Sequence, residues 1–228
     1  MDSAVQATVA MMKASRFPDD PEHYRDYQSE DGRTWRISMI SRAKLPTRFG
    51  DFSIYGFHDS RGGLEHTAIV RGSVAGLHDI PVRVHSECHT GDIFGSLRCD
   101  CRDQLEAALS YIGSQEAGAV LYMRQEGRGI GLLNKIQAYN LQDQGRDTVE
   151  ANEDLGLPAE AREYQAAAAM LDLLGIGSIA LMTNNPAKMA ALSDAGILIS
   201  RRIPIVIEPN VHNSRYLITK KVRMGHLY

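Results

Sequence analysis

The chain has 228 residues and a formal net charge of −3, from 25 lysines and arginines against 28 aspartates and glutamates. Hydrophobic residues make up 43% of the sequence and charged residues 23%, the ordinary composition of a globular protein that can bury its own core. The slight acidic excess argues against a general nucleic-acid binder, and no apolar run approaches the roughly 18–20 residues of a membrane span.

The first residues and the cysteine content point to a reducing compartment. An acidic residue, Asp2, stands near the start, and no positively charged region precedes an apolar stretch, so the start does not read as a secretory signal. The three cysteines are an odd number, which argues against a disulfide framework. We therefore expect a cytoplasmic protein.

The first part of the chain predicts an extension followed by a sheet. Residues 14–35 are polar and rich in aspartate, proline and arginine, so we expect a loose N-terminal extension of unknown role over residues 1–42. Short alternating runs then predict strands over residues 35–40, 51–57, 66–72 and 79–87. Together they predict an antiparallel sheet from about residue 36 to residue 87.

From residue 102 the apolar period changes to that of helices alternating with strands. Helices are expected over residues 102–113, 132–145, 159–175 and 187–196. Strands are expected over residues 117–123, 178–183 and 203–208, and a basic tail follows the last of them. The pattern predicts an α+β fold, with an antiparallel or mixed sheet in the first half and a βα-rich second half.

All three cysteines, Cys88, Cys99 and Cys101, lie within one short segment. Free buried cysteines are common but usually scattered, so this clustering favours a site for Zn²⁺, which prefers four ligands and accepts thiolates. Cys99 and Cys101 are two residues apart, which in an extended segment places both thiols on one side. Spacing leaves two alternatives open: a catalytic site with water in the fourth place, or a closed structural site with His85 or His89 as the fourth ligand.

A glycine-rich turn is the first candidate anion site. Residues 124–131 join a predicted strand to a predicted helix, and such a turn exposes backbone N–H groups to an anion. Arg124 and Arg128 add forked donors suited to phosphate. The spacing matches neither the P-loop nor the dinucleotide fingerprint, and a glycine-rich turn is more often only a turn.

Two further places carry cations. Lys188 falls in the first turn of the helix after residues 183–186, where the helix dipole disfavours a cation unless an anion is bound; a solvated surface lysine is the alternative. Arg83, with Glu87 nearby, stands just before the first cysteine, and an ordinary surface ion pair is the alternative there.

Long motifs in the chain resemble GTP cyclohydrolase II. They are KLPTRFGDF from Lys44, RVHSECHTGDIFGSLRCDC, RQEGRGIGLLNKIQAYNLQDQGRDTVEAN, LMTNNPAKM and the MGHL near the C-terminus. The resemblance covers roughly four-fifths of the chain and implies a GTP cyclohydrolase II-like catalytic domain over residues 43–228. It implies hydrolysis of GTP to formate, pyrophosphate and 2,5-diamino-6-ribosylamino-4(3H)-pyrimidinone 5′-phosphate, the first step of riboflavin biosynthesis.

The resemblance also implies cofactors and partners. Cys88, Cys99 and Cys101 would bind one zinc ion in an open catalytic site, where an activated water attacks guanine C8 and formate is released. Magnesium would accompany the triphosphate. A homodimer is expected, with no nucleic-acid or membrane partner. Only about 40 residues precede the match, too few for the upstream synthase domain to which this family is often fused, so we expect one activity.

Individual residues take roles from the family by position. The residues that match substrate contacts are Arg83, Val84, His85, Ser86, Glu87, Gln104, Glu126, Gly127, Arg128, Thr148, Thr183 and Lys188. Tyr139 matches a tyrosine near the C8 chemistry. Arg162 matches an arginine assigned as the nucleophile toward the α-phosphate, although a permanently protonated guanidinium suits electrostatic stabilisation better. Glu160 stands where the family usually has an aspartate as proton acceptor, and its longer side chain is the main departure.

Two other functions remain open. A diverged cyclohydrolase could act on a related nucleotide or stop at the formamide; Glu160 leaves room for this, whereas Tyr139 argues for complete hydrolysis. A non-catalytic, zinc-stabilised nucleotide binder is the other alternative, and the combination of the three cysteines with Tyr139 and Arg162 argues against it.

Overall fold

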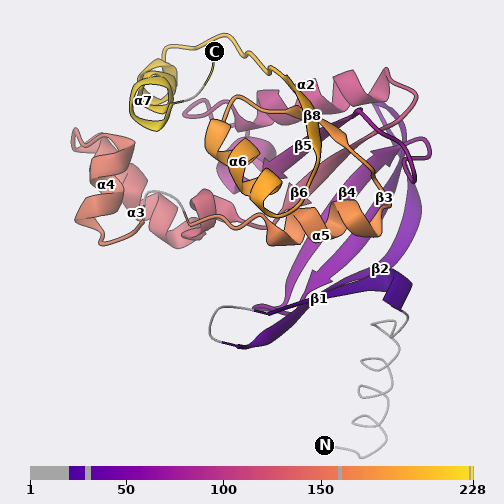
Figure 1. Ribbon diagram of the computed structural model, residues 1–228. Helices are drawn as coiled ribbons and strands as arrows, with labels where there is room; N and C mark the ends of the chain where they lie inside the picture. The colour runs from indigo at the N-terminus through magenta and orange to yellow at the C-terminus, as the bar shows by residue number, and fades with distance from the viewer. Residues whose placement is uncertain (1–20, 29–31, 159–160, 226, 228) are drawn as a thin grey trace, which may run out of the picture.

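The computed structural model describes residues 21–28, 32–158, 161–225 and 227. In this part of the chain, eight strands form one sheet in the order β1-β2-β3-β4-β6-β5-β7-β8 (Figure 1). The strands are β1 Tyr24–Gln28, β2 Thr34–Thr47, β3 Gly50–Asp59, β4 Leu64–Arg71, β5 Ile80–Ser86, β6 Gly118–Met123, β7 Ile179–Met182 and β8 Ile199–Ile203. The helices are α2 Cys101–Gly113, α3 Leu132–Asp143, α4 Thr148–Asp154, α5 Gln165–Leu173, α6 Pro186–Asp194 and α7 Ser214–Met224, with short helical turns η1 Pro21–His23, η2 His89–Ile93 and η3 Glu126–Gly129.

The sheet is antiparallel on one side and parallel on the other. Strands β1 to β4 and β6 pair antiparallel, whereas β5 pairs parallel with both β6 and β7, and β7 pairs parallel with β8. This confirms the predicted α+β fold with a mixed sheet. The expectation that β5 belongs to an antiparallel sheet is wrong, because α2 carries the chain from β5 back to the start of β6 as a crossover.

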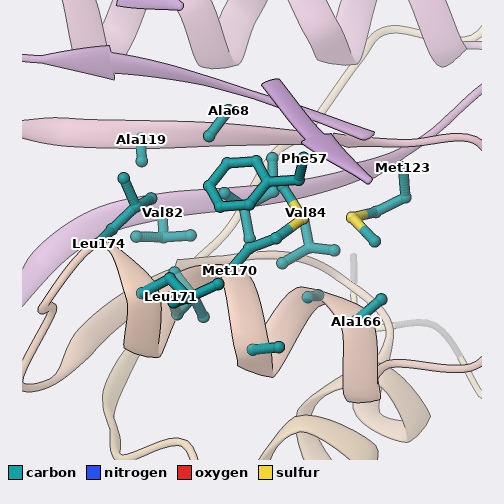
Figure 2. Packing of buried hydrophobic residues seen from close by; sticks show 14 of the residues in the cluster. Phe57, Ala68, Val82, Val84, Ala119, Met123, Ala166, Met170, Leu171 and Leu174 are labelled. Atoms are coloured by element: carbon teal, nitrogen blue, oxygen red, sulfur yellow. The ribbon is translucent and has the colours of Figure 1, made fainter. Parts of the chain in front are cut away.

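Helices cover the parallel half of the sheet on both faces. On one face α5 packs its buried side chains, among them Met170 and Leu171, against strand residues such as Phe57 and Val84 (Figure 2). On the other face α2 contributes Ile112 to a second apolar cluster. A parallel strand covered on both faces is buried on both, and in β5 every residue before Ser86 is buried.

The strand alternation of β5 separates core residues from site residues. Val82 and Val84 belong to the cluster under α5. Successive side chains on a strand point to opposite faces, so Arg83 and His85 lie on the face that α2 covers. This alternation is what presents two polar side chains beside the first turn of α2.

The expected loose N-terminal extension is wrong for part of its length. Residues Tyr24–Gln28 form β1, which pairs with β2 at the edge of the sheet. Tyr27 stacks on Trp35 with ring centroids 4.4 Å apart, and the Arg36 guanidinium lies 3.5 Å from the centre of the Tyr24 ring. These aromatic contacts attach the segment to the sheet.

The helix predicted over residues 159–175 begins later, as α5 at Gln165, and residues 161–164 are not helical. The Ala161 N–H donates to the Arg128 carbonyl at 3.0 Å, and the Glu163 carbonyl accepts from the side-chain amide of Gln125 at 2.6 Å. Because these backbone groups bond to the loop after β6, they do not take part in the hydrogen bonds of a helix. Residues 159–160 lie outside the described part.

The C-terminal part also differs from expectation. The last strand, β8, ends at Ile203, and the predicted strand over 203–208 is wrong. Pro204 lacks an N–H, and the Asn184 side chain bonds both the N–H and the carbonyl of Ile205, which leaves little for a neighbouring strand. The basic tail contains a helix, α7, that the sequence did not predict.

The remaining helices agree closely with expectation except for one omission. Helices α2, α3 and α6 form where the apolar periodicity predicted them. Helix α4 was missed; its capping box pairs the Asp147 side chain with the Glu150 backbone and the Glu150 side chain with the Asp147 backbone. Within the described ranges, none of the helices has the length and apolar character to cross a membrane.

Candidate active site

A pocket opens at the carboxyl ends of the parallel strands β5, β6 and β7, where α/β sheets usually bind ligands. The loops after these strands, the start of α2 and the inner face of α3 supply its walls. The predicted site residues that line it are Arg83, His85, Ser86, Glu87, Cys88, Cys99, Cys101, Gln104, Glu126, Gly127, Arg128, Tyr139, Arg162, Thr183 and Lys188.

Three of the residues that the family resemblance assigned to the site are not among the lining side chains. Val84 is fully buried in the core under α5, although its carbonyl accepts a hydrogen bond from Lys188 Nζ at 2.7 Å. Thr148 begins α4, and its side chain lies outside the described part. Glu160 also lies outside the described residues.

The three thiols converge on one point. Cys88 Sγ and Cys99 Sγ are 3.6 Å apart, and the three sulfur atoms lie within 4.8 Å of one another. Tetrahedral zinc at about 2.3 Å from each sulfur separates thiolates by about 3.8 Å, so the donor set fits zinc. Within the described residues, this group includes no histidine or carboxylate.

Chain geometry around Gly91 brings the thiols together. Cys101 begins α2, so the expectation of an extended segment is wrong; the helical turn η2 reverses the chain instead. A Cβ added to Gly91 would lie 2.8 Å from Cys99 Sγ and 3.1 Å from Cys88 Sγ. Only glycine leaves room for the sulfur atoms here.

A buried lysine lies against the thiol cluster. Lys135 Nζ donates to Cys88 Sγ at 3.1 Å and to Glu126 Oε1 at 2.8 Å. Hydrogen bonds from Cys101 and Cys99, together with the nearby Lys135 charge, hold the pKa of the Cys88 thiol far below its ordinary value. Hydrogen bonds to Cys88 and Cys99 and burial raise the pKa of Cys101 well above the ordinary thiol value. A bound cation would displace the thiol protons of the cluster.

The pocket lining is strongly cationic. Six cationic side chains line it, namely Arg83, Arg98, Arg128, Lys135, Arg162 and Lys188. The two carboxylates in the lining already have cationic partners: Glu87 pairs with Arg124 at 3.0 Å, and Glu126 pairs with Lys135. The positive excess suits a ligand with several negative charges.

Several polar atoms of the lining are buried without a partner in the described structure. They are Arg83 Nε, His85 Nδ1, Ser86 Oγ and Arg128 Nη1. A buried polar group without a hydrogen bond costs about 1–3 kcal/mol. Their grouping in one pocket indicates a site built for a polar ligand that supplies both donors and acceptors.

The glycine-rich turn after β6 is more than a connection. Gly127 has φ 63° and Arg128 has φ 61°, so two consecutive residues adopt the left-handed conformation, which is costly for arginine. The Arg128 carbonyl accepts from Ala161 N–H, and one arm of its guanidinium lies 3.4 Å from the Tyr216 hydroxyl. These contacts hold the other arm in the pocket.

Lys188 and Arg83 are both buried, so the surface alternatives for them are wrong. Lys188 is only 4% exposed. Arg83 donates to the Met182 carbonyl at 2.9 Å and to Gln104 Oε1 at 2.5 Å, and it makes no ion pair with Glu87. Burial lowers the pKa of Arg83 to about 10.

Tyr139 lies beside the thiol cluster. Its hydroxyl is 3.3 Å from Thr90 Oγ1, which is 3.7 Å from Cys88 Sγ. The Arg98 guanidinium stands 4.9 Å from the centre of its ring. Burial raises the pKa of Tyr139 to about 12, so the phenol keeps its proton.

Sequence reasoning missed several lining residues. Lys135 precedes Tyr139 by four positions, and on a helix this spacing places both side chains on one face, a signal that was available. Tyr216 comes from α7, whose position over the pocket no sequence pattern revealed. Asn152, Asn184 and Asn185 line the pocket as well.

Comparisons with known proteins agree on one family. The family model of GTP cyclohydrolase II matches residues 38–204. The chain is 57% identical to GTP cyclohydrolase-2 of Picrophilus torridus over 84% of this chain and 100% of that protein. It is 52% identical to GTP cyclohydrolase-2 of Cronobacter sakazakii over 84% of this chain and 98% of that protein. It is also 53% identical to riboflavin biosynthesis protein RibBA of Nocardia farcinica, of which it spans 46%.

Proposed function

The chain belongs to the GTP cyclohydrolase II family, and on this premise we propose that its pocket hydrolyses GTP to formate, pyrophosphate and 2,5-diamino-6-ribosylamino-4(3H)-pyrimidinone 5′-phosphate. This is the first step of riboflavin biosynthesis. The observation that carries the proposal is that three converging thiols and six cationic side chains line one pocket. A zinc site next to a polyanion site suits ring hydrolysis of a nucleoside triphosphate.

Cys88, Cys99 and Cys101 are the proposed zinc ligands. When bound, zinc supplies a Lewis acid that activates water for attack on guanine C8. The chain's own contribution is to present three thiols from two loop positions and the first turn of α2, with Gly91 packed against them. Lys135 adds a positive charge beside the Cys88 thiol.

The cationic part of the pocket is the proposed triphosphate site. Arg128 has an unpartnered guanidinium nitrogen there, and Lys188 lies in the first turn of α6, whose helix dipole favours an anion. Thr183, buried before that helix, lies in the same wall. Magnesium bound to the triphosphate would offset the remaining negative charge.

Three residues are proposed to act on the reacting groups. Tyr139 donates a hydrogen bond from its neutral phenol during formate release, because it lies beside the thiols and keeps its proton. Arg162, which lines the pocket, stabilises negative charge on the α-phosphate as pyrophosphate leaves. Glu160 accepts a proton in that step, as its position in the sequence suggests.

The remaining substrate contacts are proposed by position in the pocket or in the chain. Arg83, His85, Ser86, Glu87 and Gln104 contribute side chains near the thiols. Val84 would contribute only through its backbone, since its side chain is buried in the core. Glu126 and Gly127 form part of the glycine-rich turn after β6. Thr148 is proposed as a substrate contact because its position in the sequence matches one in the family.

We further propose a cytoplasmic homodimer that binds neither nucleic acid nor membranes. Exposed apolar side chains support a protein interface: Ile93, Phe94 and Leu97 before α2 are 57%, 72% and 58% exposed, and Leu133 on α3 is 77% exposed. A domain boundary at residue 42 would fall inside β2, so residues 24–42 are proposed to extend the catalytic sheet of domain 43–228.

Incubation of the purified protein with GTP, zinc and magnesium tests the activity. Formate, pyrophosphate and the pyrimidinone phosphate should appear in equal amounts by mass spectrometry and enzymatic assay. A formamide product without formate would indicate a diverged cyclohydrolase, and binding without turnover would indicate a nucleotide binder. Either result would overturn the proposal. Cys99→Ser should abolish both zinc binding and turnover.

A further inference from the structure

Asp92 lies at the centre of a buried hydrogen-bond network outside the predicted site residues. Its Oδ2 accepts from the Cys88 N–H at 2.9 Å and from the Tyr122 hydroxyl at 2.8 Å, and it lies 3.0 Å from His85 Nε2. The Asp92 and His85 side chains are 4% and 3% exposed. One carboxylate therefore links a thiol ligand to a histidine of the pocket.

The sheet register explains why these groups meet. His85 on β5 pairs with Tyr122 on the parallel strand β6, which places their side chains on the same face. The two rings stack with centroids 5.4 Å apart. Helical turn η2 then brings Asp92 back to the ends of both side chains.

The network determines which nitrogen of His85 carries its proton. Asp92 Oδ2 already accepts from the Cys88 N–H and the Tyr122 hydroxyl, so the contact of His85 Nε2 with this acceptor oxygen assigns the ring proton to Nε2. Burial lowers the pKa of His85, which favours the neutral imidazole. Nδ1 is then a bare acceptor, and in the described structure it is buried in the pocket without a partner.

The position of His85 indicates which part of the substrate can donate a hydrogen bond to its Nδ1. Phosphate oxygens are acceptors and offer no proton to Nδ1. His85 and Cys88 share one carboxylate oxygen, and the reaction requires guanine C8 at the zinc site. The guanine ring carries N–H donors at N1 and at the 2-amino group, on the edge opposite C8, so a base whose C8 lies at the thiols presents them one ring width away. The ribose hydroxyls are the other donors of the substrate, and the 2′-deoxy analogue below tests the 2′-hydroxyl.

We propose that Asp92, with Tyr122, is a positioning residue that fixes His85 as its Nε2–H tautomer, so that His85 Nδ1 accepts a hydrogen bond from a guanine N–H and selects the base. This inference rests on the proposed function and names the acceptor for the base. It assigns roles to Asp92 and Tyr122, neither of which lines the pocket.

Ring-nitrogen NMR of histidine-labelled protein tests the tautomer directly, with His85→Phe to assign the signal. His85 should show a protonated Nε2 and a bare Nδ1. The Nδ1 signal should move when a non-hydrolysable GTP analogue binds and stay in place with inorganic tripolyphosphate. A protonated Nδ1, or no movement with the analogue, would overturn the proposal. Asp92→Asn places an N–H donor beside Nε2 and should shift the tautomer, whereas Asp194→Asn, an exposed control, should not.

Binding measurements separate the base from the rest of the substrate. His85→Phe should weaken the GTP analogue at least about tenfold, as loss of one buried hydrogen bond does, and leave tripolyphosphate binding within about twofold. His212→Phe, at an exposed position, is the matched control. Equal weakening of both ligands would refute a base contact. If the loss disappears with the 2′-deoxy analogue, the ribose is the partner and the proposal fails.

These results are independent of turnover. A wild-type protein that releases no formate from GTP would refute the proposed function. The tautomer and the ligand-dependent Nδ1 shift are read on the resting protein and on an analogue that does not react. Zinc content, measured for each variant, confirms that the altered residue has left the thiol cluster intact.

Discussion

Lys135 Nζ lies 3.1 Å from Cys88 Sγ, and the same nitrogen lies 2.8 Å from Glu126 Oε1. One ammonium group therefore joins the thiol cluster to the glycine-rich turn. The Lys135 and Glu126 side chains are 12% and 10% exposed, so solvent screens this contact little. Three thiolates around one zinc leave a net negative charge, which the lysine offsets.

Lys135→Met should therefore weaken zinc binding by roughly ten- to a hundredfold, the usual effect of removing a partner of a metal ligand. Competition with a chromogenic chelator measures the affinity. Lys135→Arg keeps the charge and should lose less. Lys44→Met, at an exposed position on β2, is the control and should leave zinc binding unchanged. An unaltered zinc affinity in Lys135→Met would show that Lys135 stabilises only the glycine-rich turn, through Glu126.

Gly91→Ala should reduce zinc binding without unfolding the sheet. The added Cβ would lie 2.8 Å from Cys99 Sγ, closer than real contacts allow, so one thiol must move away. Gly56→Ala is the matched control, since nothing lies within 4 Å of its Cβ position and its φ is not positive. Zinc content per chain, alongside a thermal melt, checks this. Full zinc content in Gly91→Ala would mean that the cluster tolerates the shift.

The sequence predicted best where one chemical pattern was enough. Strands β2 to β7 and helices α2, α3 and α6 have clear apolar periodicity, and their side chains fill the two clusters on either face of the sheet. Periodicity does not reveal strand direction, however. The parallel pairing of β5 follows from the crossover through α2, which is a property of the whole topology.

The wrong helix start before Gln165 and the wrong strand over residues 203–208 have one cause. In both segments, residues distant in the sequence form hydrogen bonds with the backbone groups. Residues 161–164 carry good helix formers, yet Ala161 N–H bonds the Arg128 carbonyl. Residues 203–208 alternate like a strand, yet the Asn184 side chain occupies both backbone groups of Ile205. Such long-range hydrogen bonds override local preference, and no single-sequence pattern announces them.

The sequence predicted many of the residues of the site but not how they are arranged in space. The cysteine cluster and four of the six cationic lining residues, Arg83, Arg128, Arg162 and Lys188, were found from the sequence, and all of these line one pocket. Asp92 was not, because a lone aspartate in a turn has an ordinary structural explanation. Its role is visible only when the register of β5 and β6 places His85 beside Tyr122.

Tyr139→Phe should slow formate release more than pyrophosphate release. The hydroxyl stands 3.3 Å from Thr90 Oγ1, which lies 3.7 Å from Cys88 Sγ. Quenched-flow measurement of both products gives the two rates. Because burial raises the pKa of Tyr139 to about 12, the phenol stays protonated over the working pH range. The variant should therefore keep the basic limb of the wild-type pH profile. Equal slowing of both products would remove the special role of the tyrosine.

Glu160→Gln should depress pyrophosphate release, since the amide cannot accept a proton, while zinc content stays normal. Glu160→Asp tests the length of the side chain, because a misplacement of about 1 Å can cost much of the rate. Glu163→Gln, three residues on and exposed, is the control. If Glu160→Asp raises the rate, the longer side chain is a departure from the optimum. If Glu160→Gln has no effect, the proton goes elsewhere.

Arg162 distinguishes charge stabilisation from covalent catalysis. If its guanidinium stabilises charge at the α-phosphate, Arg162→Gln should slow pyrophosphate release by roughly a hundred- to a thousandfold, as loss of such a group does elsewhere. Arg162→Lys keeps the positive charge and should recover part of that loss. A covalent role predicts instead that both variants are equally inactive and that a nucleotide adduct accumulates on the wild-type peptide containing Arg162. Acid-quenched digests analysed by mass spectrometry show whether that adduct exists.

Arg146→Gln, at an exposed arginine paired with Asp154, is the control for loss of a surface charge. A half-buried cation in the pocket wall is already placed to stabilise charge, whereas acting as a nucleophile would require it to lose a proton that proteins do not remove.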